Sequence, residues 1–513
     1  MSENWSSGYV TDLSYTHGFY KEMSPALLRF AAAACSVRAN TRSRDKTTYC
    51  ELGSGQGLTS NILAAANPDI EFYATDFNPE QIYNAQAIAS AANLKNIHFF
   101  DDSFSDFDKR SDLPQFNVIS LHGIYSWIAK EHRDTIIRFI ERRLKPGGVV
   151  YISYNCLPGW AGSSPLRHLM RMQAERSVGS TPQRIDAALA FLDRFQEQEP
   201  RFFKATPGAK ERVQRLKGVS RNYIAHEYLN ADWTLFYHSD VAAELSGARL
   251  SYVGSADILD HVDSIHLTDA QQAFVKEAPD ATMRETLRDY ILNRQFRKDI
   301  FIRGAVSLGV PEAREEWLDT RFALVGNGSD IPMKLKGTLG EVTLQETAYK
   351  PVIAAFENAG GSITLRQVVS DKTIAGLGWN RLQRVLLTLV GAGHLQPCPG
   401  EDTNAPARKE SIRRFNDVIL AKARHSGDLS YLASPVTGSG VPVNRFMQLF
   451  LLAVQENSAD PVAYVWNIFR QNNQKLTKDG KALETDEENI ASLKERYADF
   501  QKHMPVLKRL GIA

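Results

Sequence analysis

The residues best placed to do chemistry lie near the start of the chain, in the stretch ELGSGQG from Glu51 to Gly57. Glycine lets the backbone pass close to a ligand, and the N-terminus of a following helix favours negative charge. Asp76 lies twenty-one positions beyond Gly55, at the end of the next apolar run. A carboxylate at that distance can accept both hydroxyls of a ribose, so the spacing indicates a site for a ribose-containing cofactor.

Two other interpretations of this stretch exist. A dinucleotide site needs the pattern G-x-G-x-x-G, but the sixth place is Leu58 here and the glycines follow G-x-G-x-G, which disfavours NAD. A glycine-rich turn without a ligand is the second alternative. Asp76 taken alone is a common residue at a helix start, and Asn78 with Pro79 offers another helix start.

A second group of polar and aromatic residues follows two later apolar runs, in the stretches LHGIYSW (121–127) and SYNCLPGW (153–160). A buried strand can end in a glycine or a charge, whereas a site needs hydrogen-bonding and aromatic side chains. An aromatic mouth suits a cationic ligand, because a cation over a ring face gains ~0.5 to 2 kcal/mol. Each side chain alone could equally belong to core or surface. The candidate catalytic residues are Tyr154, Asn155, His122, Tyr125, Trp127 and Trp160.

Strand and helix patterns alternate over the first part of the chain, which predicts an α/β fold with a Rossmann-like, mostly parallel sheet. Ligands of such sheets bind at the carboxyl ends of the strands, beside the point where the strand order reverses. We expect the helix that begins at Lys130 to be closed by Pro146 and the two glycines after it. The expected strands are 49–52, 70–75, 97–100, 116–121, 149–153, 250–253 and 298–304.

The pattern E-x-G-x-G-x-G, with an acid at the end of the second strand, resembles motifs I and II of the class I S-adenosylmethionine-dependent methyltransferases. The resemblance implies a seven-stranded sheet and S-adenosyl-L-methionine as cofactor, with Asp76 on the ribose and Phe77 against the adenine. The aspartate that usually ends the third strand is replaced by Ser103, which leaves the adenine contact open among Asp102, Ser103 and Phe104. The cofactor-binding residues implied are Glu51, Gly53, Ser54, Gly55, Gly57, Asp76, Phe77, Asp102, Ser103, Phe104 and His122.

Later sequence segments narrow the resemblance to one group of these methyltransferases. HGIYSW, YNCLPGW, YIAHEYLN (223–230), LSYVGSAD (250–257) and LASPVTGSGVPVNRF (432–446) are similar to bacterial methyltransferases that carry a methyltransferase regulatory domain. That group includes rickettsial protein lysine methyltransferases, which implies a protein side chain as acceptor, with a lysine amine favoured. A sugar or small molecule is the alternative acceptor.

The chemistry of methyl transfer to an amine suggests roles for individual residues. We expect Tyr125, Trp127, Tyr154 and Trp160 to desolvate the acceptor amine, the Asn155 carbonyl to orient it, and His122 to accept its proton directly or through water. In the resembling enzymes the N-terminal segment helps to close the site and mediates dimerisation. This implies a homodimer and adds secondary site candidates, with packing of a short arm as the alternative. They are Tyr15, Phe19 and Tyr20.

The length of 513 residues predicts about three domains. The third helix of the expected winged-helix-like domain is the one that would read DNA. It offers only Arg381 and Arg384, so we favour protein contact over DNA contact. In the cap, His226, Glu227 and Tyr228 could reach the acceptor or form a surface pair. The expected parts are an N-terminal arm (1–44), a core (45–305) with a helical substrate cap (about 161–238), a β-rich linker with the winged-helix-like domain (306–410), and a helical region (411–513).

Bulk composition excludes some functions. Sixty Lys and Arg against 59 Asp and Glu give a net charge of +1, so nucleic acid is not an expected partner. The four cysteines lack the spacing of a zinc site or a disulfide framework, and no metal is expected. Without a leader or an apolar run of ~18 residues, a cytoplasmic location and no membrane insertion are expected. The alternative of another class is a non-catalytic regulator that binds the cofactor and contacts protein or DNA through the winged helix.

Overall fold

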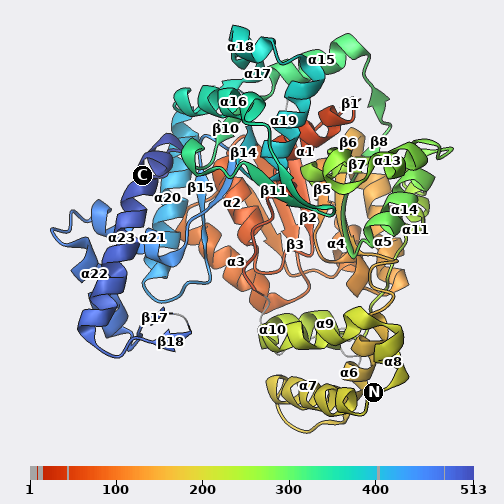
Figure 1. Cartoon of the computed structure of the whole chain (residues 1–513), viewed down its shortest axis with the longest axis horizontal. Helices are drawn as coiled ribbons and strands as arrows, with labels where there is room; N and C mark the ends of the chain where they lie inside the picture. Colours follow the sequence, from red (N-terminus) through yellow and green to blue (C-terminus); the bar gives the residue numbers. More distant parts are fainter. Residues whose placement is uncertain (1–8, 10–15, 43–45, 401–404, 479) are drawn as a thin grey trace.

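A seven-stranded sheet with the strand order β4-β3-β2-β5-β6-β8-β7 organises the protein (Figure 1). The computed structural model describes residues 9, 16–42, 46–400, 405–478 and 480–513. All neighbouring pairs are parallel except those made by β8, which is antiparallel to both β6 and β7. The strands are β2 (Thr47–Leu52), β3 (Ile70–Thr75), β4 (Ile97–Phe100), β5 (Phe116–Leu121), β6 (Leu144–Asn155), β7 (Leu250–Ser255) and β8 (Phe296–Arg303).

This sheet confirms the predicted Rossmann-like fold class, with its mostly parallel, seven-stranded core. One boundary prediction was wrong. The helix α5 (Lys130–Arg143) ends three residues before Pro146, because Leu144 already pairs with Phe116 of β5 in the sheet. The strand β6 then continues to Asn155, two residues beyond its expected end.

Helices cover both faces of the sheet, as expected when strands are buried on both sides. Alternate residues of each strand face opposite ways, so Val149 and Tyr151 pack on one face while Val150 and Ile152 pack on the other. The first face is covered by α1 (Pro25–Ala34), α2 (Leu58–Ala66) and α3 (Pro79–Ala91), and the second by α4 (Phe104–Lys109), α5 and α11 (His238–Ser246).

Between β6 and α11 the chain forms a separate group of helices with its own buried apolar cluster. In Figure 1 this group projects below the sheet. It occupies the range expected for the cap, and we use that name for residues 164–229 from here on. Its elements are α6 (Ser164–Arg176), α7 (Thr181–Glu197), α8 (Arg201–Ala205), α9 (Pro207–Lys217), α10 (Arg221–Ile224) and the π-helical turn η3 (Ala225–Leu229).

Beyond β8 the chain packs against the first face of the sheet through the same apolar cluster. The middle part contains a three-stranded sheet, order β13-β10-β14. The winged-helix designation of this part stays a prediction. Its elements are α15 (Val310–Asp319), β10 (Arg321–Leu324), β11 (Lys334–Gly337), β12 (Gly340–Thr343), α16 (Glu346–Asn358), β13 (Ser362–Thr364), α17 (Leu365–Val368), α18 (Lys372–Ala375), α19 (Trp379–Gly391) and β14 (Leu395–Cys398).

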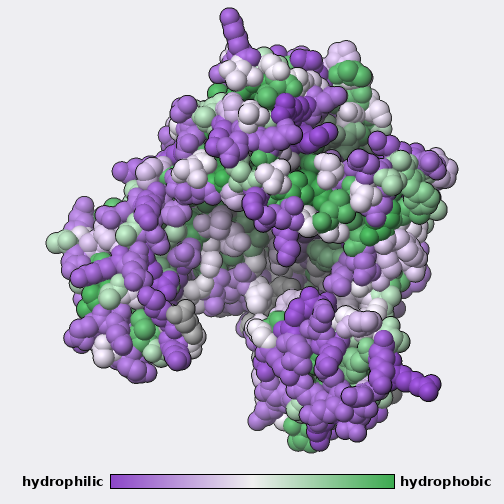
Figure 2. All heavy atoms as spheres, viewed as in Figure 1, coloured by the Kyte–Doolittle hydropathy of each residue, from purple (hydrophilic) through white to green (hydrophobic). Residues whose placement is uncertain are grey.

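The last part is mostly helical and also holds two short hairpins. Figure 2 shows a hollow between this part and the cap, which project from the core as two lobes. No helix in the described ranges is both long and apolar enough to cross a membrane. The elements are α20 (Ala405–Ala423), β15 (Tyr431–Ser434), β16 (Ser439–Pro442), α21 (Arg445–Gln455), α22 (Pro461–Gln471), β17 (Thr477–Lys478), β18 (Lys481–Ala482) and α23 (Asp486–Arg509).

Candidate active site

The glycine-rich turn after β2 forms the floor of a cavity at the carboxyl end of the sheet. The backbone amides of Gly53 and Ser54 donate hydrogen bonds to the carbonyl of Thr75, over 2.8 and 3.0 Å. Gly57 has φ +65° at the start of α2, and a Cβ there would lie 2.5 Å from the Cβ of Ala85. Only glycine therefore allows the turn to pass so close to the neighbouring helix.

Asp76 is held rigidly at the edge of this cavity. Its two carboxylate oxygens accept hydrogen bonds from the amides of Gly55 (2.9 Å) and Asn78 (3.0 Å). Burial raises the pKa of Asp76 to about 6, although the two amide hydrogen bonds oppose this shift. The carboxylate is thus fixed in position and ionised at neutral pH, with oxygen lone pairs left for a ligand.

Glu51, on β2, is a second buried acid that lines the cavity. Its carboxylate accepts a hydrogen bond from the hydroxyl of Ser60, which lowers its pKa, but burial and the nearby Asp76 together raise that pKa to about 8. Glu51 is therefore largely protonated at neutral pH, and a cation placed beside it would favour the charged form.

All residues predicted for cofactor binding line one cavity, and the predicted set comes from four different strand ends. They are Glu51, Gly53, Ser54, Gly55, Gly57, Asp76, Phe77, Asp102, Ser103, Phe104 and His122. Further lining residues that sequence reasoning did not single out are Tyr9, Thr16, Gly18, Gln56, Leu58, Thr59, Gln81, Gly123, Ile124, Ile128, Ala129, His132 and Asp232.

The residues that follow β4 are the three candidates for the adenine contact, and all three line the cavity. The Asp102 carboxylate accepts a hydrogen bond from the Arg110 guanidinium, and that guanidinium lies over the ring of Phe100 at 4.4 Å. The Ser103 hydroxyl accepts a hydrogen bond from the amide of Asp106 at the start of α4. Both side chains keep acceptor capacity beside these partners and line the cavity with Phe104, so the adenine contact stays a prediction among Asp102, Ser103 and Phe104.

His122 ends β5 in an aromatic setting. Its ring is stacked on Tyr20, with ring centroids 3.5 Å apart, and its Nδ1 lies 2.7 Å from the Tyr151 hydroxyl. Burial lowers the pKa of His122 to about 3, because the nearby Glu22 only partly offsets the cost of charging a buried imidazole. His122 is therefore neutral throughout the physiological range.

The candidate catalytic residues do not all reach the cavity. His122 and Trp127 line it. The other four, Tyr125, Tyr154, Asn155 and Trp160, are buried behind it and are not among its lining residues in the described part of the chain. The six residues therefore do not together line the opening of the cavity.

Each of these four residues has a partner in the protein interior. The Tyr154 hydroxyl donates to Asp299 over 2.6 Å, and the Tyr125 hydroxyl donates to Glu244. Trp160 lies under the guanidinium of Arg212, 4.1 Å from the ring centroid. Asn155 is the last residue of β6, and its backbone N–H donates to the Ser126 hydroxyl over 2.9 Å. Direct contact with a substrate stays a prediction for all four.

The N-terminal segment and the cap meet over the cavity. The ring of Tyr9 lies 5.8 Å from that of Phe77 and 5.5 Å from that of His226. Of the secondary candidates, Tyr20 lines the cavity, Phe19 packs on Tyr431 at 5.2 Å, and Tyr15 lies outside the described residues. Only long-range packing brings Tyr9 and Tyr20 here, so no local pattern in the sequence could have identified Tyr9.

The cap residue Glu227 is buried near Tyr9, and burial raises its pKa to about 7 although Arg167 and Arg212 lower it. Tyr228 is also buried, and its hydroxyl accepts a hydrogen bond from Arg212 over 2.8 Å. His226, Glu227 and Tyr228 therefore do not form the exposed surface pair that was the alternative for them.

Comparison with known proteins agrees with this site. A methyltransferase domain matches residues 43–191, and a predicted methyltransferase regulatory domain matches residues 220–303. An uncharacterised protein of Synechocystis sp. is 41% identical over 510 residues, which is 99% of this chain and all of that protein. An uncharacterised protein of Rickettsia prowazekii is 28% identical over 484 residues, covering 88% of this chain and 84% of the relative.

The overall fold is also that of solved structures. PKMT2 from Rickettsia typhi superposes with a TM-score of 0.68 at 17% identity, over 97% of this chain and 100% of that one, and its complex with AdoHcy gives the same score at 18% identity. The sheet and the site define a class I methyltransferase. The chain belongs to the S-adenosylmethionine-dependent methyltransferases that carry a methyltransferase regulatory domain. Residues 220–303 include β7 and β8, so the regulatory domain contributes two strands to the common sheet.

Proposed function

We propose that this methyltransferase transfers the methyl group of S-adenosylmethionine, bound in the cavity, to a protein side chain, with a lysine amine as the favoured acceptor. The observation that carries the proposal is the Asp76 carboxylate, which the Gly55 and Asn78 amides hold at the cavity edge. The similarity in fold to PKMT2 from Rickettsia typhi supports a protein acceptor. A sugar or small molecule is the alternative acceptor.

The cavity residues suit the separate parts of the cofactor. Asp76 accepts the two ribose hydroxyls, and the glycine-rich turn from Gly53 to Gly57 lies against the methionine part. Glu51 is the buried acid nearest that turn in sequence, and a cofactor ammonium beside it would restore its charge. Phe77 and Phe104 offer apolar faces to the adenine.

Methyl transfer is an in-line displacement, in which the amine lone pair forms the new N–C bond as the C–S bond breaks. The thioether leaves with the electron pair, and the methylated amine then loses a proton. A lysine amine has an ordinary pKa of ~10.4, so the enzyme must bind or produce its neutral form. The stacked rings of Tyr20 and His122 provide a largely apolar wall that favours the neutral amine.

His122 fits a positioning role better than that of a strong base. Its Nδ1 lies against the Tyr151 hydroxyl, and its low pKa makes the protonated imidazole unfavourable. We therefore propose that His122 orients the acceptor and that the released proton goes to water. Tyr154 and Asn155 support this wall from within β6 rather than touching the amine.

For the remaining parts of the chain we propose the roles that the sequence suggests. We propose that residues 306–410 serve protein contact, because Arg381 is already engaged with Gln345 across that region. A cytoplasmic location is also proposed. The thiols of Cys35, Cys50, Cys156 and Cys398 are all free, which fits a reducing compartment.

Isotope transfer tests the proposal. The purified chain, incubated with S-adenosylmethionine labelled on the methyl group and a lysate of the source organism, should label discrete protein bands. Acid hydrolysis should release the label as methyl-lysine. Asp76→Ala should remove the labelling, and Asp417→Ala, an exposed carboxylate paired with Arg413, serves as the matched control. Tight cofactor binding without transfer to protein, sugar or small molecule would instead favour a non-catalytic regulator.

A further inference from the structure

The cap carries the excess positive charge of the chain. Residues 164–229 contain twelve Lys and Arg but seven Asp and Glu, whereas the whole chain has 60 and 59. The cap is thus a basic module on a protein whose remainder is slightly acidic. A local field of this kind attracts ligands of the opposite charge and orients them before contact.

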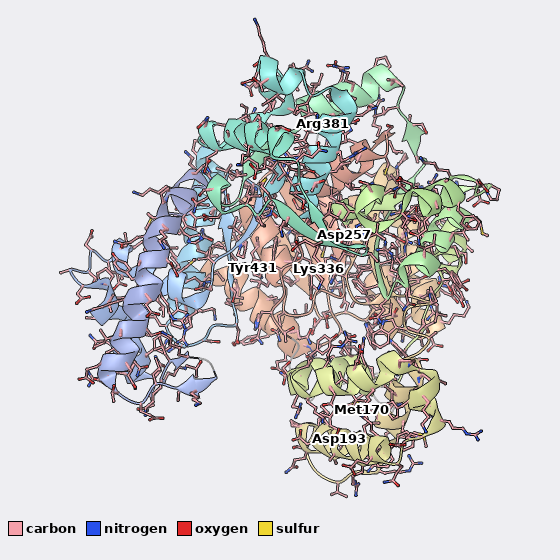
Figure 3. The ribbon with its side chains drawn as sticks, in the orientation of Figure 1. Met170, Asp193, Asp257, Lys336, Arg381 and Tyr431 are labelled. Carbon is pink, nitrogen blue, oxygen red and sulfur yellow. The ribbon has the colours of Figure 1, made fainter. Side chains whose placement is uncertain are left out.

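Part of this charge is neutralised within the cap. Four cations pair with cap carboxylates: Arg171 with Glu175, Lys204 with Glu199, Lys217 with Asp193, and Arg221 with Asp186. Figure 3 labels Asp193 in the lowest part of the cap, together with Met170 in its interior. Two more, Arg167 and Arg212, are turned inward and lie over tryptophan rings. These six cations are therefore engaged by neighbouring side chains.

A second set of cap cations is not paired in this way. For these side chains no ion pair with a carboxylate occurs among the residues that the structure describes. Four of the set are exposed on consecutive elements α7, α8 and α9. The whole set comprises Arg176, Arg184, Arg194, Arg201, Lys210 and Arg215. The four exposed members on α7–α9 are Arg194, Arg201, Lys210 and Arg215.

The cap adjoins the cavity directly. Arg171 of α6 donates a hydrogen bond to the carbonyl of Ala231 over 2.7 Å, and the next residue, Asp232, lines the cavity. Trp233 then stacks on Trp127, another lining residue, with ring centroids 6.2 Å apart. The cap thus adjoins the cavity through α6 and the segment that follows the cap, so a chain bound to α7–α9 would lie on the lobe that borders the cavity.

We propose that the exposed cations of α7–α9 bind an acidic segment of the methyl-acceptor protein, with Asp and Glu residues flanking the modified side chain. This rests on the proposed protein acceptor and specifies its class. An anionic segment beside a lysine would dock on the cap while the lysine enters the cavity. Because the charges are exposed, their attraction acts over ~8 Å at physiological salt and mainly speeds encounter.

A nucleic acid is the less suited partner. Single strands bind through aromatic platforms on which bases stack. Tyr228 of the cap and the adjoining Trp160 are buried, and Arg167 covers Trp233, which follows the cap. Tyr223, 40% exposed, is the one aromatic side chain counted among the large exposed apolar residues of the cap as described.

Binding can be tested without methyl transfer, so failure of this proposal is distinguishable from failure of the proposed activity. The full chain, saturated with S-adenosylhomocysteine, is titrated into a fluorescent peptide that has glutamates on both sides of one lysine. Fluorescence anisotropy should show that the affinity falls about tenfold or more between low and high salt. A peptide with glutamine in place of glutamate should bind at least about tenfold more weakly.

Charge-reversal variants locate the surface. The triple variant Arg194→Glu, Arg201→Glu, Lys210→Glu should weaken peptide binding about tenfold or more and leave cofactor affinity unchanged. The matched control, Lys336→Glu, Lys372→Glu, Lys494→Glu, reverses three exposed charges outside the cap and should stay within about twofold of the parent. Figure 3 labels Lys336, which lies outside the cap on β11.

Three outcomes would overturn the proposal. The first is equal binding of the glutamate and glutamine peptides, and the second is equal loss in the cap and control variants. The third is a preference of the cap for a single-stranded RNA oligonucleotide over the acidic peptide at the same salt concentration. A neutral variant, Arg194→Gln, Arg201→Gln, Lys210→Gln, confirms that any loss comes from charge if its effect is intermediate.

Discussion

The Gly55 amide donates a hydrogen bond to the Asp76 carboxylate over 2.9 Å, which joins the two motifs that a methyltransferase needs for its cofactor. The first prediction follows from this contact. Asp76→Ala removes two ribose hydrogen bonds of ~1.5 to 3 kcal/mol each, so cofactor affinity should fall at least about tenfold. Isothermal titration calorimetry with S-adenosylhomocysteine measures it. Unchanged affinity would show that the ribose lies elsewhere.

The pH dependence of cofactor binding gives a second prediction. The pKa of Asp76 is raised to about 6 by burial, and the ribose hydroxyls need the ionised carboxylate as acceptor. Affinity should therefore increase from pH 5 to pH 7 and level off above. The Asp76→Asn variant should bind more weakly and lose this pH dependence. A parent affinity that is constant over this range would contradict the assignment.

The same shift affects the stability of the ligand-free protein in the opposite direction. A carboxyl with a raised folded pKa holds more protons in the folded state than in the unfolded state between about pH 4 and pH 6. The stability from Asp76 is thus fully present below pH 4 and lost as the pH rises through 6. Thermal unfolding of parent and Asp76→Asn, compared across this window, separates this contribution from other groups.

A third prediction concerns His122, whose pKa of about 3 means that it does not change charge in the assay range. Turnover should increase with pH as the acceptor amine deprotonates, with no inflection from an imidazole near pH 6 to 7. His122→Asn should lower kcat by misplacing the acceptor but should leave the shape of the pH profile unchanged. Loss of an inflection near pH 6.5 in that variant would identify His122 as the base after all.

Sequence alone could predict the cofactor side of the site because its residues follow directly on strand ends. Parallel strands bring their carboxyl ends to one edge, so Glu51, Asp76 and Phe104 had to meet once the sheet was identified. The side facing the acceptor was harder to predict. Tyr9, Tyr20 and Asp232 reach the cavity from distant segments, and only packing of the arm and cap determines their approach.

Tyr154 shows how packing decides where the side chain of a predicted catalytic residue lies. The sequence placed Tyr154 at the end of the strand, just after the apolar run 149–152, where its side chain was expected to face a ligand. In the structure β6 runs on to Asn155, and Tyr154 pairs with Arg297 of β8 within the ladder. Alternation along a strand then turns its ring into the sheet face, where Phe236 and Asp299 surround it.

The fourth prediction tests this placement. Tyr154→Phe leaves the buried Asp299 carboxylate with Arg297 and His238 but without one hydrogen bond, which should cost ~1 to 3 kcal/mol of stability. Thermal unfolding should detect the loss. Turnover of the folded protein and cofactor affinity should stay within a few-fold. A large fall in kcat without a change in melting temperature would instead support the direct catalytic role first expected for Tyr154.

The last prediction compares two glycines that share one backbone conformation. The comparison separates the free-energy cost of left-handed backbone strain from that of steric crowding by a methyl group. Gly57 and Gly304 both have φ +65°. A Cβ at Gly57 would lie 2.5 Å from the Cβ of Ala85 and 2.8 Å from the Phe99 ring, whereas none of the described atoms lies within 4 Å of that position at Gly304. Gly304→Ala should therefore cost only the left-handed strain of ~1 to 2 kcal/mol.

Gly57→Ala should cost that strain and, in addition, ~1 to 3 kcal/mol for forcing a methyl group into a packed helix contact. It should also displace the turn that carries Gly55, so cofactor affinity should fall in this variant and stay unchanged in Gly304→Ala. Urea unfolding and calorimetry on both variants provide the comparison. Equal stability losses would mean that α2 and α3 can separate without penalty, and the close approach of this turn would then not be what requires glycine at position 57.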